Sequence, residues 1–152
     1  MIRDKMVFGG MIGFLANVAM NFFQYPLWKL KVIEHPLAHY AGSMFMDVET
    51  LHHTLLGSFI SFVANSSYSA FLGIFFVYTV YFTGGHAFIV KGLLFGAFVW
   101  LFSFGGLRSL PMVQLREYIS SQALYYLFIH LVFGLALGLL INKFGEPALR
   151  KE

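Results

Sequence analysis

Four long apolar segments constrain the fold of this chain more than any other feature of its sequence. They cover residues 6–28, 51–83, 87–107 and 121–142. A helix that crosses the hydrocarbon core of a bilayer needs about 20 predominantly apolar residues, so each segment is long enough. Backbone amides in lipid must be paired within their own segment, which favours helices over open strands. The sequence therefore predicts an all-α polytopic membrane protein, a four-transmembrane-helix bundle forming a single domain over residues 1–152.

The composition supports lipid rather than water as the solvent of this chain. Hydrophobic residues make up 59% of its 152 residues and charged residues 11%, with a mean hydropathy of +0.73. Soluble domains contain about 45–50% apolar and about 25% charged residues. The net charge of +3 is spread along the chain without a basic run, so the lipid bilayer, and no nucleic acid, is the expected partner. The lack of cysteine excludes disulfides and thiolate metal sites.

The positive charges that flank the segments give the expected orientation, because cytoplasmic loops carry an excess of Lys and Arg. Four crossings place both termini on one side. On that side lie Arg3, Lys5, Lys91, Lys143, Arg150 and Lys151, and on the other side lie Lys29, Lys31, Arg108 and Arg116. This bias of six to four favours cytoplasmic termini. The two longer loops, 29–50 and 108–121, then face outward and are expected to contain short interfacial helices.

Two pairs of short motifs indicate a possible internal repeat. "KMVFGG" opens the first apolar segment and "KGLLFGA" the third, while "HTLLG" opens the second and "HLVFG" lies inside the fourth. The last pair aligns His53 with His130. The chain would then be a duplicated helical hairpin with halves 1–83 and 84–152, related by an axis along the membrane normal.

Small and polar residues follow one face of each of the first two segments. In the first segment these are Gly10, Gly13, Asn17, Asn21 and Gln24, and in the second they are Ser58, Ser61, Asn65 and Ser69. Spacings of three and four place such residues on one side of a helix. The common use of this stripe is helix packing, with amides and hydroxyls bonded across the seam. The alternative is a wet pathway or a binding pocket between the two helices.

The last two segments carry glycine pairs. These are Gly92 with Gly96 and Gly134 with Gly138, each pair four residues apart. Such spacing lets two helix backbones approach closely. The pairs are therefore expected to support either the bundle itself or a homo-oligomer.

His130 is the strongly titratable side chain that lies well inside an apolar segment. An ionisable group at membrane depth is a functional hypothesis by default. The alternative is a neutral imidazole bonded to Ser, Tyr or a backbone carbonyl. If the repeat is real, His53 lies at a matching depth, and the two imidazoles could ligate a haem or a metal ion.

The first outer loop holds a second group of possible metal ligands. They are His35, His39, Glu49, His52 and His53. Pairs spaced by three or four residues share one face of a helix, as in carboxylate-bridged metal sites. Against a di-iron enzyme stands the lack of a carboxylate inside any apolar segment. Alternatively, Asp47 caps the second helix, and Glu49 lies in its first turn.

No catalytic motif is apparent in the sequence. It has no nucleophile elbow, no phosphate-binding loop and no acid pair. The expected function is therefore a non-enzymatic membrane protein without a cofactor. It would act as a small oligomeric channel or carrier, or as an accessory subunit of a membrane complex. The alternative is a haem- or metal-binding membrane protein that uses the histidines described above.

Two stretches carry a resemblance to known families. "GGMIGFLANVAM" near the start and "HLVFGLALGLL" near the end resemble small bacterial four-helix inner-membrane families of unknown function. The resemblance covers residues 9–20 and 130–138. It implies an all-helical, multi-pass protein of the bacterial cytoplasmic membrane, and it implies no activity.

Overall fold

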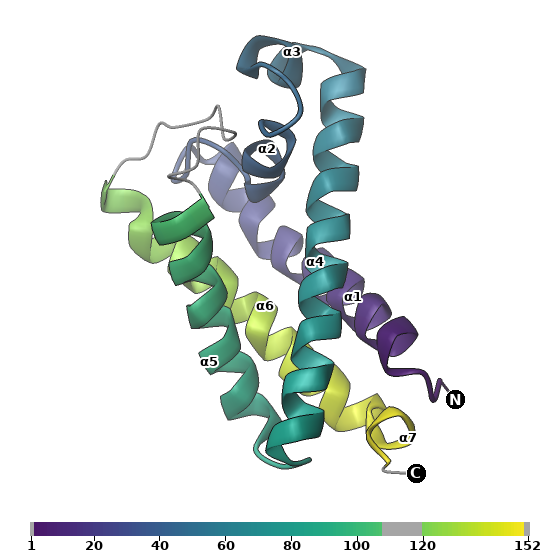
Figure 1. Cartoon of the computed structure of the whole chain (residues 1–152). Helices are drawn as coiled ribbons and strands as arrows, with labels where there is room; N and C mark the ends of the chain where they lie inside the picture. The colour runs from purple at the N-terminus through teal and green to yellow at the C-terminus, as the bar shows by residue number, and fades with distance from the viewer. Residues whose placement is uncertain (1, 108–119, 151–152) are drawn as a thin grey trace.

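The computed structural model describes residues 2–107 and 120–150, and within them all regular structure is helical. Four helices are long and apolar enough to cross a membrane. They are α1 (Lys5–Lys29), α4 (Leu55–Thr83), α5 (Phe88–Leu101) continued by the π-helical turn η1 (Phe102–Gly106), and α6 (Ala123–Phe144) (Figure 1). The prediction of an all-helical chain with four candidate spans is confirmed.

Short helices connect and extend the four long ones. Helices α2 (Leu37–Gly42) and α3 (Val48–His53) follow α1, the 3-10 turn η3 (Ser120–Gln122) precedes α6, and α7 (Glu146–Leu149) follows it. The first of the two longer loops thus contains short helices, whereas most of the second, 108–119, lies outside the described residues. Both termini lie at one end of the bundle, and α2 and α3 lie at the other (Figure 1). This arrangement is the one that an even number of crossings requires.

The second apolar segment is not one helix, and the prediction that Asp47 caps the spanning helix is wrong. Asp47 caps α3 by accepting a hydrogen bond from Thr50 N at 2.8 Å. Thr54 then leaves the helical conformation, with φ −123° and ψ 150°, and its Oγ1 accepts from Gly57 N at 2.9 Å to start α4. Side-chain oxygens of Asp and Thr satisfy the free N–H groups at helix starts. Two such residues seven positions apart therefore start two helices.

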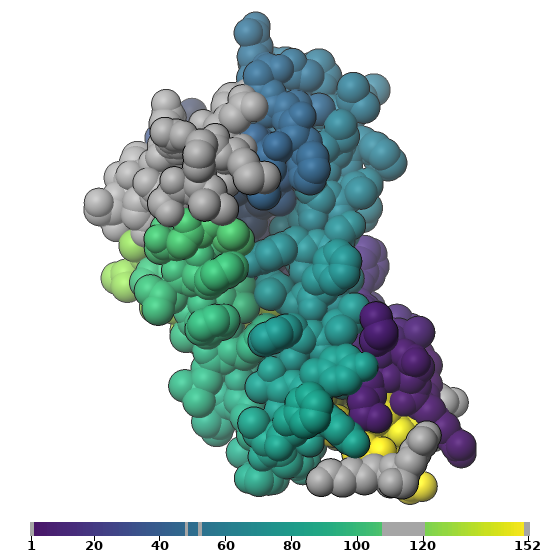
Figure 2. Space-filling model, in the orientation of Figure 1, coloured from purple at the N-terminus to yellow at the C-terminus, as the bar shows by residue number. Residues whose placement is uncertain are grey.

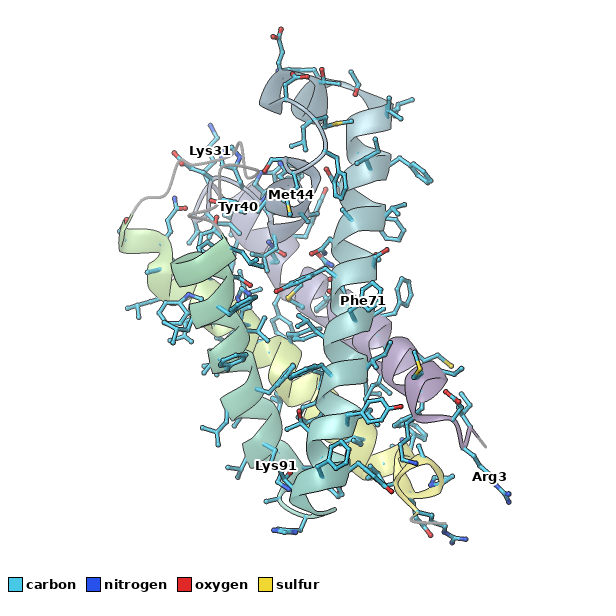
Figure 3. All side chains as sticks on the ribbon, in the orientation of Figure 1. Arg3, Lys31, Tyr40, Met44, Phe71 and Lys91 are labelled. Atoms are coloured by element: carbon cyan, nitrogen blue, oxygen red, sulfur yellow. The ribbon has the colours of Figure 1, made fainter. Side chains whose placement is uncertain are left out.

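The outer surface of the bundle is apolar along its length. Only 22–44% of the residues in the most apolar windows of the four long helices are buried. Phe71 of α4, for example, is 70% exposed and points away from the bundle (Figure 3). The charged side chains of Arg3 and Lys91 lie at the end that holds the termini, and Lys31 lies at the opposite end. Figure 2 shows α5 beside α4 on one face, with α2 and α3 above them.

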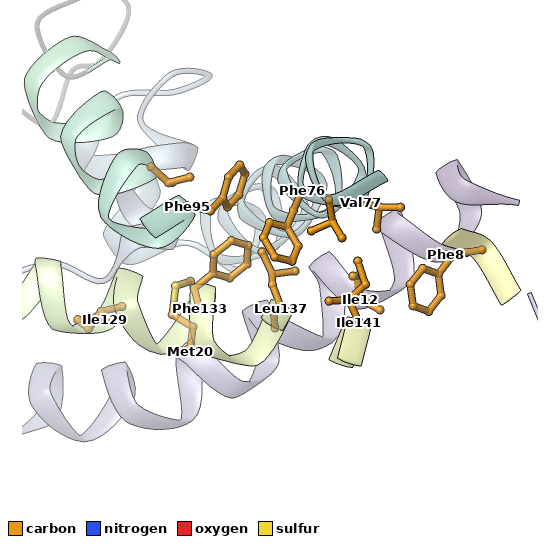
Figure 4. Packing of buried hydrophobic residues seen from close by; sticks show 14 of the residues in the cluster. Phe8, Ile12, Met20, Phe76, Val77, Phe95, Ile129, Phe133, Leu137 and Ile141 are labelled. Atoms are coloured by element: carbon orange, nitrogen blue, oxygen red, sulfur yellow. The ribbon is translucent and has the colours of Figure 1, made fainter. Parts of the chain in front are cut away.

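The core joins the helices in pairs. Helix α1 packs along α4, α5 packs along α6, and α6 also packs on α1. Helix α4 meets α5 through aromatic rings, and the centroids of Phe76 and Phe95 are 5.2 Å apart. Phe133 of α6 points toward the same two rings (Figure 4). Each half of the chain thus forms one helix pair, while a duplication itself stays a prediction.

Candidate functional site

A line of buried residues at steps of four runs along α4. Its members are Gly57, Ser61, Asn65, Ser69 and Gly73. The first two members lie against α3 and α2, and the other three lie against α1. On α1, Gly9 and Gly13 lie against this line. A methyl group on Gly13 would overlap the Ser69 carbonyl oxygen, and one on Gly73 would overlap the Gly9 carbonyl oxygen. The two backbones therefore touch, as small residues at helix contacts permit.

Two residues of the predicted stripe lie off this contact. A Cβ on Gly10 would meet no atom of the described chain within 4 Å, whereas Gly9 lies against the backbone of Ile74. Ser58 is exposed, and its Oγ donates to the Thr54 carbonyl at 3.3 Å. The physical reason is that the contact follows strict steps of four, whereas the predicted stripe mixed steps of three and four.

The side chain of Asn17 bonds to three other side chains of α1 and α4. Its Oδ1 accepts from Asn65 Nδ2 at 2.9 Å and from Asn21 Nδ2 at 3.0 Å. Its own Nδ2 donates to Ser66 Oγ at 3.5 Å. The bonds of Asn17 to Asn65 and Ser66 cross the α1–α4 seam, as a packing stripe requires, while the bond to Asn21 lies within α1. The buried side chains of Gln24 and Ser61 make no hydrogen bond within the described chain.

The glycine pairs of α5 and α6 meet each other within this chain. A methyl group on Gly92 would overlap the Gly134 carbonyl oxygen, and one on Gly134 would overlap that of Gly92. A methyl group on Gly96 would overlap the His130 carbonyl oxygen. A Cβ on Gly138 would lie 2.7 Å from the Phe88 carbonyl oxygen. The predicted close contact is therefore used inside the bundle.

A cavity of about 310 Å³ lies between the two helix pairs and beneath α2. Its wall is mostly apolar, with Met20, Met44, Leu72, Val99 and Phe133 among its residues. Six of its polar wall residues are Tyr40, Asn65, Tyr68, Ser69, Ser103 and His130. A second hollow, of about 490 Å³, lies near the termini between α1 and the end of α6. The first combines an apolar wall with buried polar groups, which is the usual make-up of a small-molecule site.

The π-helical turn at the end of α5 supplies one wall of the cavity. Its Ser103 Oγ lies 3.3 Å from Tyr68 OH of α4. The ring of its Phe104 lies 4.7 Å from Tyr126 and 5.9 Å from the His130 ring, between centroids. Such turns are rare and often mark functional sites. Tyr68, Ser103 and Phe104 were not predicted from the sequence. The one signal was Ser103, which interrupts an apolar run two residues before Gly105 and Gly106.

His130 is buried at the cavity wall, with 4% of its surface exposed. Its Nδ1 lies 2.7 Å from the Tyr126 carbonyl oxygen. A carbonyl only accepts hydrogen bonds, so Nδ1 carries the hydrogen, and Nε2 of the neutral ring is an acceptor. A charged ring is disfavoured, because no charged side chain lines the described cavity wall. This geometry matches the alternative of a neutral imidazole bonded to a backbone carbonyl.

The structure does not gather the other predicted ligands around His130. His53 ends α3 outside the four long helices and is exposed. The rings of His35 and His39 lie 6.3 Å apart, between centroids, while Glu49 is exposed in the first turn of α3.

The His52 side chain lies outside the described residues. Where side chains are described, no three His, Asp or Glu groups could hold one metal ion. Haem or metal binding therefore stays a prediction without an assembled ligand set.

The residues described at this cavity could bind a ligand, and no group of catalytic side chains is recognised among them. An apolar wall, one imidazole acceptor and a pair of hydroxyls meet at one cavity. Comparison with known proteins adds nothing to this description: no family model matches the chain, and no curated protein or solved structure matches it significantly. The function of the cavity must therefore be argued from its own residues.

Proposed function

We propose that this chain is a non-enzymatic integral membrane protein that binds a mainly apolar small molecule in the cavity between its two helix pairs. It would act as a carrier for that molecule or as a ligand-binding subunit of a membrane complex. The observation that carries the proposal is the cavity itself, about 310 Å³ in volume, apolar over most of its wall. The few polar groups on that wall would orient a ligand.

A water-filled channel along the α1–α4 stripe has less support. The amides of that stripe bond to each other, and the glycine contacts bring the two backbones together. A pathway there would require both sets of contacts to open.

The homo-oligomer stays a prediction. The exposed apolar surface of the bundle could face either lipid or a second copy of the chain.

Saturable binding of a hydrocarbon probe tests this proposal. Purified protein in lipid nanodiscs should bind about one mole of para-octyltoluene per mole of protein in equilibrium dialysis, above the amount taken up by empty nanodiscs. Ala64→Trp should abolish this excess, because Ala64 lines the cavity and the indole would fill it. Val63→Trp is the matched control, since Val63 is 43% exposed on the outer surface. Uptake equal to that of empty nanodiscs would refute the proposal.

We expect a cytoplasmic membrane location in bacteria with both termini inside the cell. The chain contains no cysteine, so single cysteines report their side of the membrane. Ile2→Cys should resist an impermeant maleimide in intact cells, and Glu49→Cys, exposed in α3 at the other end of the bundle, should react. The opposite pattern would reverse the orientation without affecting the cavity.

A further inference from the structure

The cavity holds a buried hydrogen-bond acceptor that the protein does not satisfy. His130 Nδ1 donates to the Tyr126 carbonyl, which leaves Nε2 of the neutral ring with a lone pair. No residue of the described chain donates to this nitrogen, and the ring lines the cavity. A buried acceptor without a donor is costly, and most buried polar groups in proteins have a partner. The ring nitrogen is therefore open to a donor from within the cavity.

A pair of hydroxyl groups belongs to the same cavity wall. Tyr68 OH and Ser103 Oγ lie 3.3 Å apart and join α4 to η1. Each hydroxyl has one hydrogen to donate, and their mutual bond uses only one of the two. The pair therefore keeps one hydrogen and several lone pairs to offer to a third group. The cavity thus presents an acceptor from α6 together with a donor and acceptors from the other side.

Charge narrows the class of ligand. None of the described residues that line the cavity is Lys, Arg, Asp or Glu. An anionic or cationic ligand would lose its hydration there without gaining a counter-charge, which is strongly unfavourable. A neutral hydroxyl, by contrast, both donates and accepts. It can donate to the imidazole acceptor and accept from the hydroxyl pair.

We propose that the ligand of this cavity is an uncharged lipophilic alcohol or phenol, whose hydroxyl donates a hydrogen bond to His130 Nε2. The inference rests on the proposed function, since it names the chemical class of the molecule that the cavity binds. The apolar body of the ligand lies against the methionine, leucine and phenylalanine wall. Its hydroxyl is the one group that needs polar partners.

The test compares two probes of nearly equal shape, para-octylphenol and para-octyltoluene, bound to the 152-residue chain in nanodiscs. Affinities are referred to the probe concentration in the lipid phase, as measured with empty nanodiscs. The phenol should bind about three- to tenfold more tightly, the usual effect of one hydrogen bond. His130→Phe should remove this preference and leave the binding of para-octyltoluene in place. His86→Phe, the same exchange at an exposed residue outside the cavity wall, should retain the preference.

A second variant keeps the test decisive if His130→Phe does not fold. Tyr68→Phe removes one hydroxyl and keeps the ring, so it should lower the preference for the phenol without affecting the hydrocarbon. Equal affinity of the wild-type protein for both probes would overturn the inference and leave the proposed function standing. A preference that survives in a folded His130→Phe protein would overturn it as well. Saturable binding of neither probe would refute the proposed function, and the inference with it.

Discussion

Leucine in place of Gly13 should separate α1 from α4 and destabilise the protein by more than about 3 kcal/mol, the upper range for overpacked cores. Even a Cβ at this position would lie 3.0 Å from the Cα atoms of Ala70 and Gly73, and closer still to a carbonyl oxygen. Both neighbours are backbone atoms that cannot rotate away. Thermal unfolding in mild detergent, followed by circular dichroism, measures the loss.

Gly10→Leu is the matched control, three residues away on the same helix. A Cβ there meets nothing within 4 Å in the described chain. Leucine also favours a helix over glycine by up to about 1 kcal/mol. This variant should therefore be as stable as the wild type or slightly more stable. Equal losses at the two positions would contradict the contact described between α1 and α4.

Asn17→Leu should have the next largest effect, a destabilisation of about 2–4 kcal/mol. The change removes the acceptor shared by Asn65 and Asn21 and the donor to Ser66. Asn65 has 5% of its surface exposed, so its amide Nδ2 would lose its acceptor at a largely buried position. Unfolding by titration with a denaturing detergent gives the difference in free energy.

A double variant separates the lost bond from the orphaned amide. Asn17→Leu combined with Asn65→Leu should recover part of the stability, because the Asn65 amide that lost its acceptor is then removed as well. Asn142→Leu, an exposed asparagine at the end of α6, should change stability little. The two side chains are not coupled if the losses add. The double variant would then be less stable than Asn17→Leu by the loss that Asn65→Leu causes on its own.

The four long helices could be predicted from the sequence because length and apolar content alone determine that a segment can span a bilayer. The start of the second span could not. Thr54 and Asp47 are both good helix caps, and hydropathy does not reveal that the chain uses each of them for a separate helix. The predicted aligned depth of His53 and His130 depended on a single helix there, which the structure does not have.

The residues at the α1–α4 contact could be predicted only in part from the sequence. The polar stripe on α1 was recognised, yet Gly9 and Gly10 are equally small neighbours, and only the partner helix decides which one it touches. The cavity was beyond sequence reasoning for a different reason. Tyr68, Ser103 and His130 come from three elements, and a π-helical turn, which no apolar pattern reveals, brings Ser103 to the wall.

The pairing of the helices has a mechanical consequence. Within each pair the backbones touch at glycines, so the two members cannot slide or separate without losing a close-packed contact. Between α4 and α5 there are phenylalanine rings and open volume instead. The two pairs are therefore held together by side chains, where α6 packs on α1 and where α4 meets α5, and within each pair the backbones are in direct contact. Met20 of α1 and Phe133 of α6 line the cavity, so a bulky molecule held there would press on the side chains between the two pairs and leave the glycine contacts within each pair untouched.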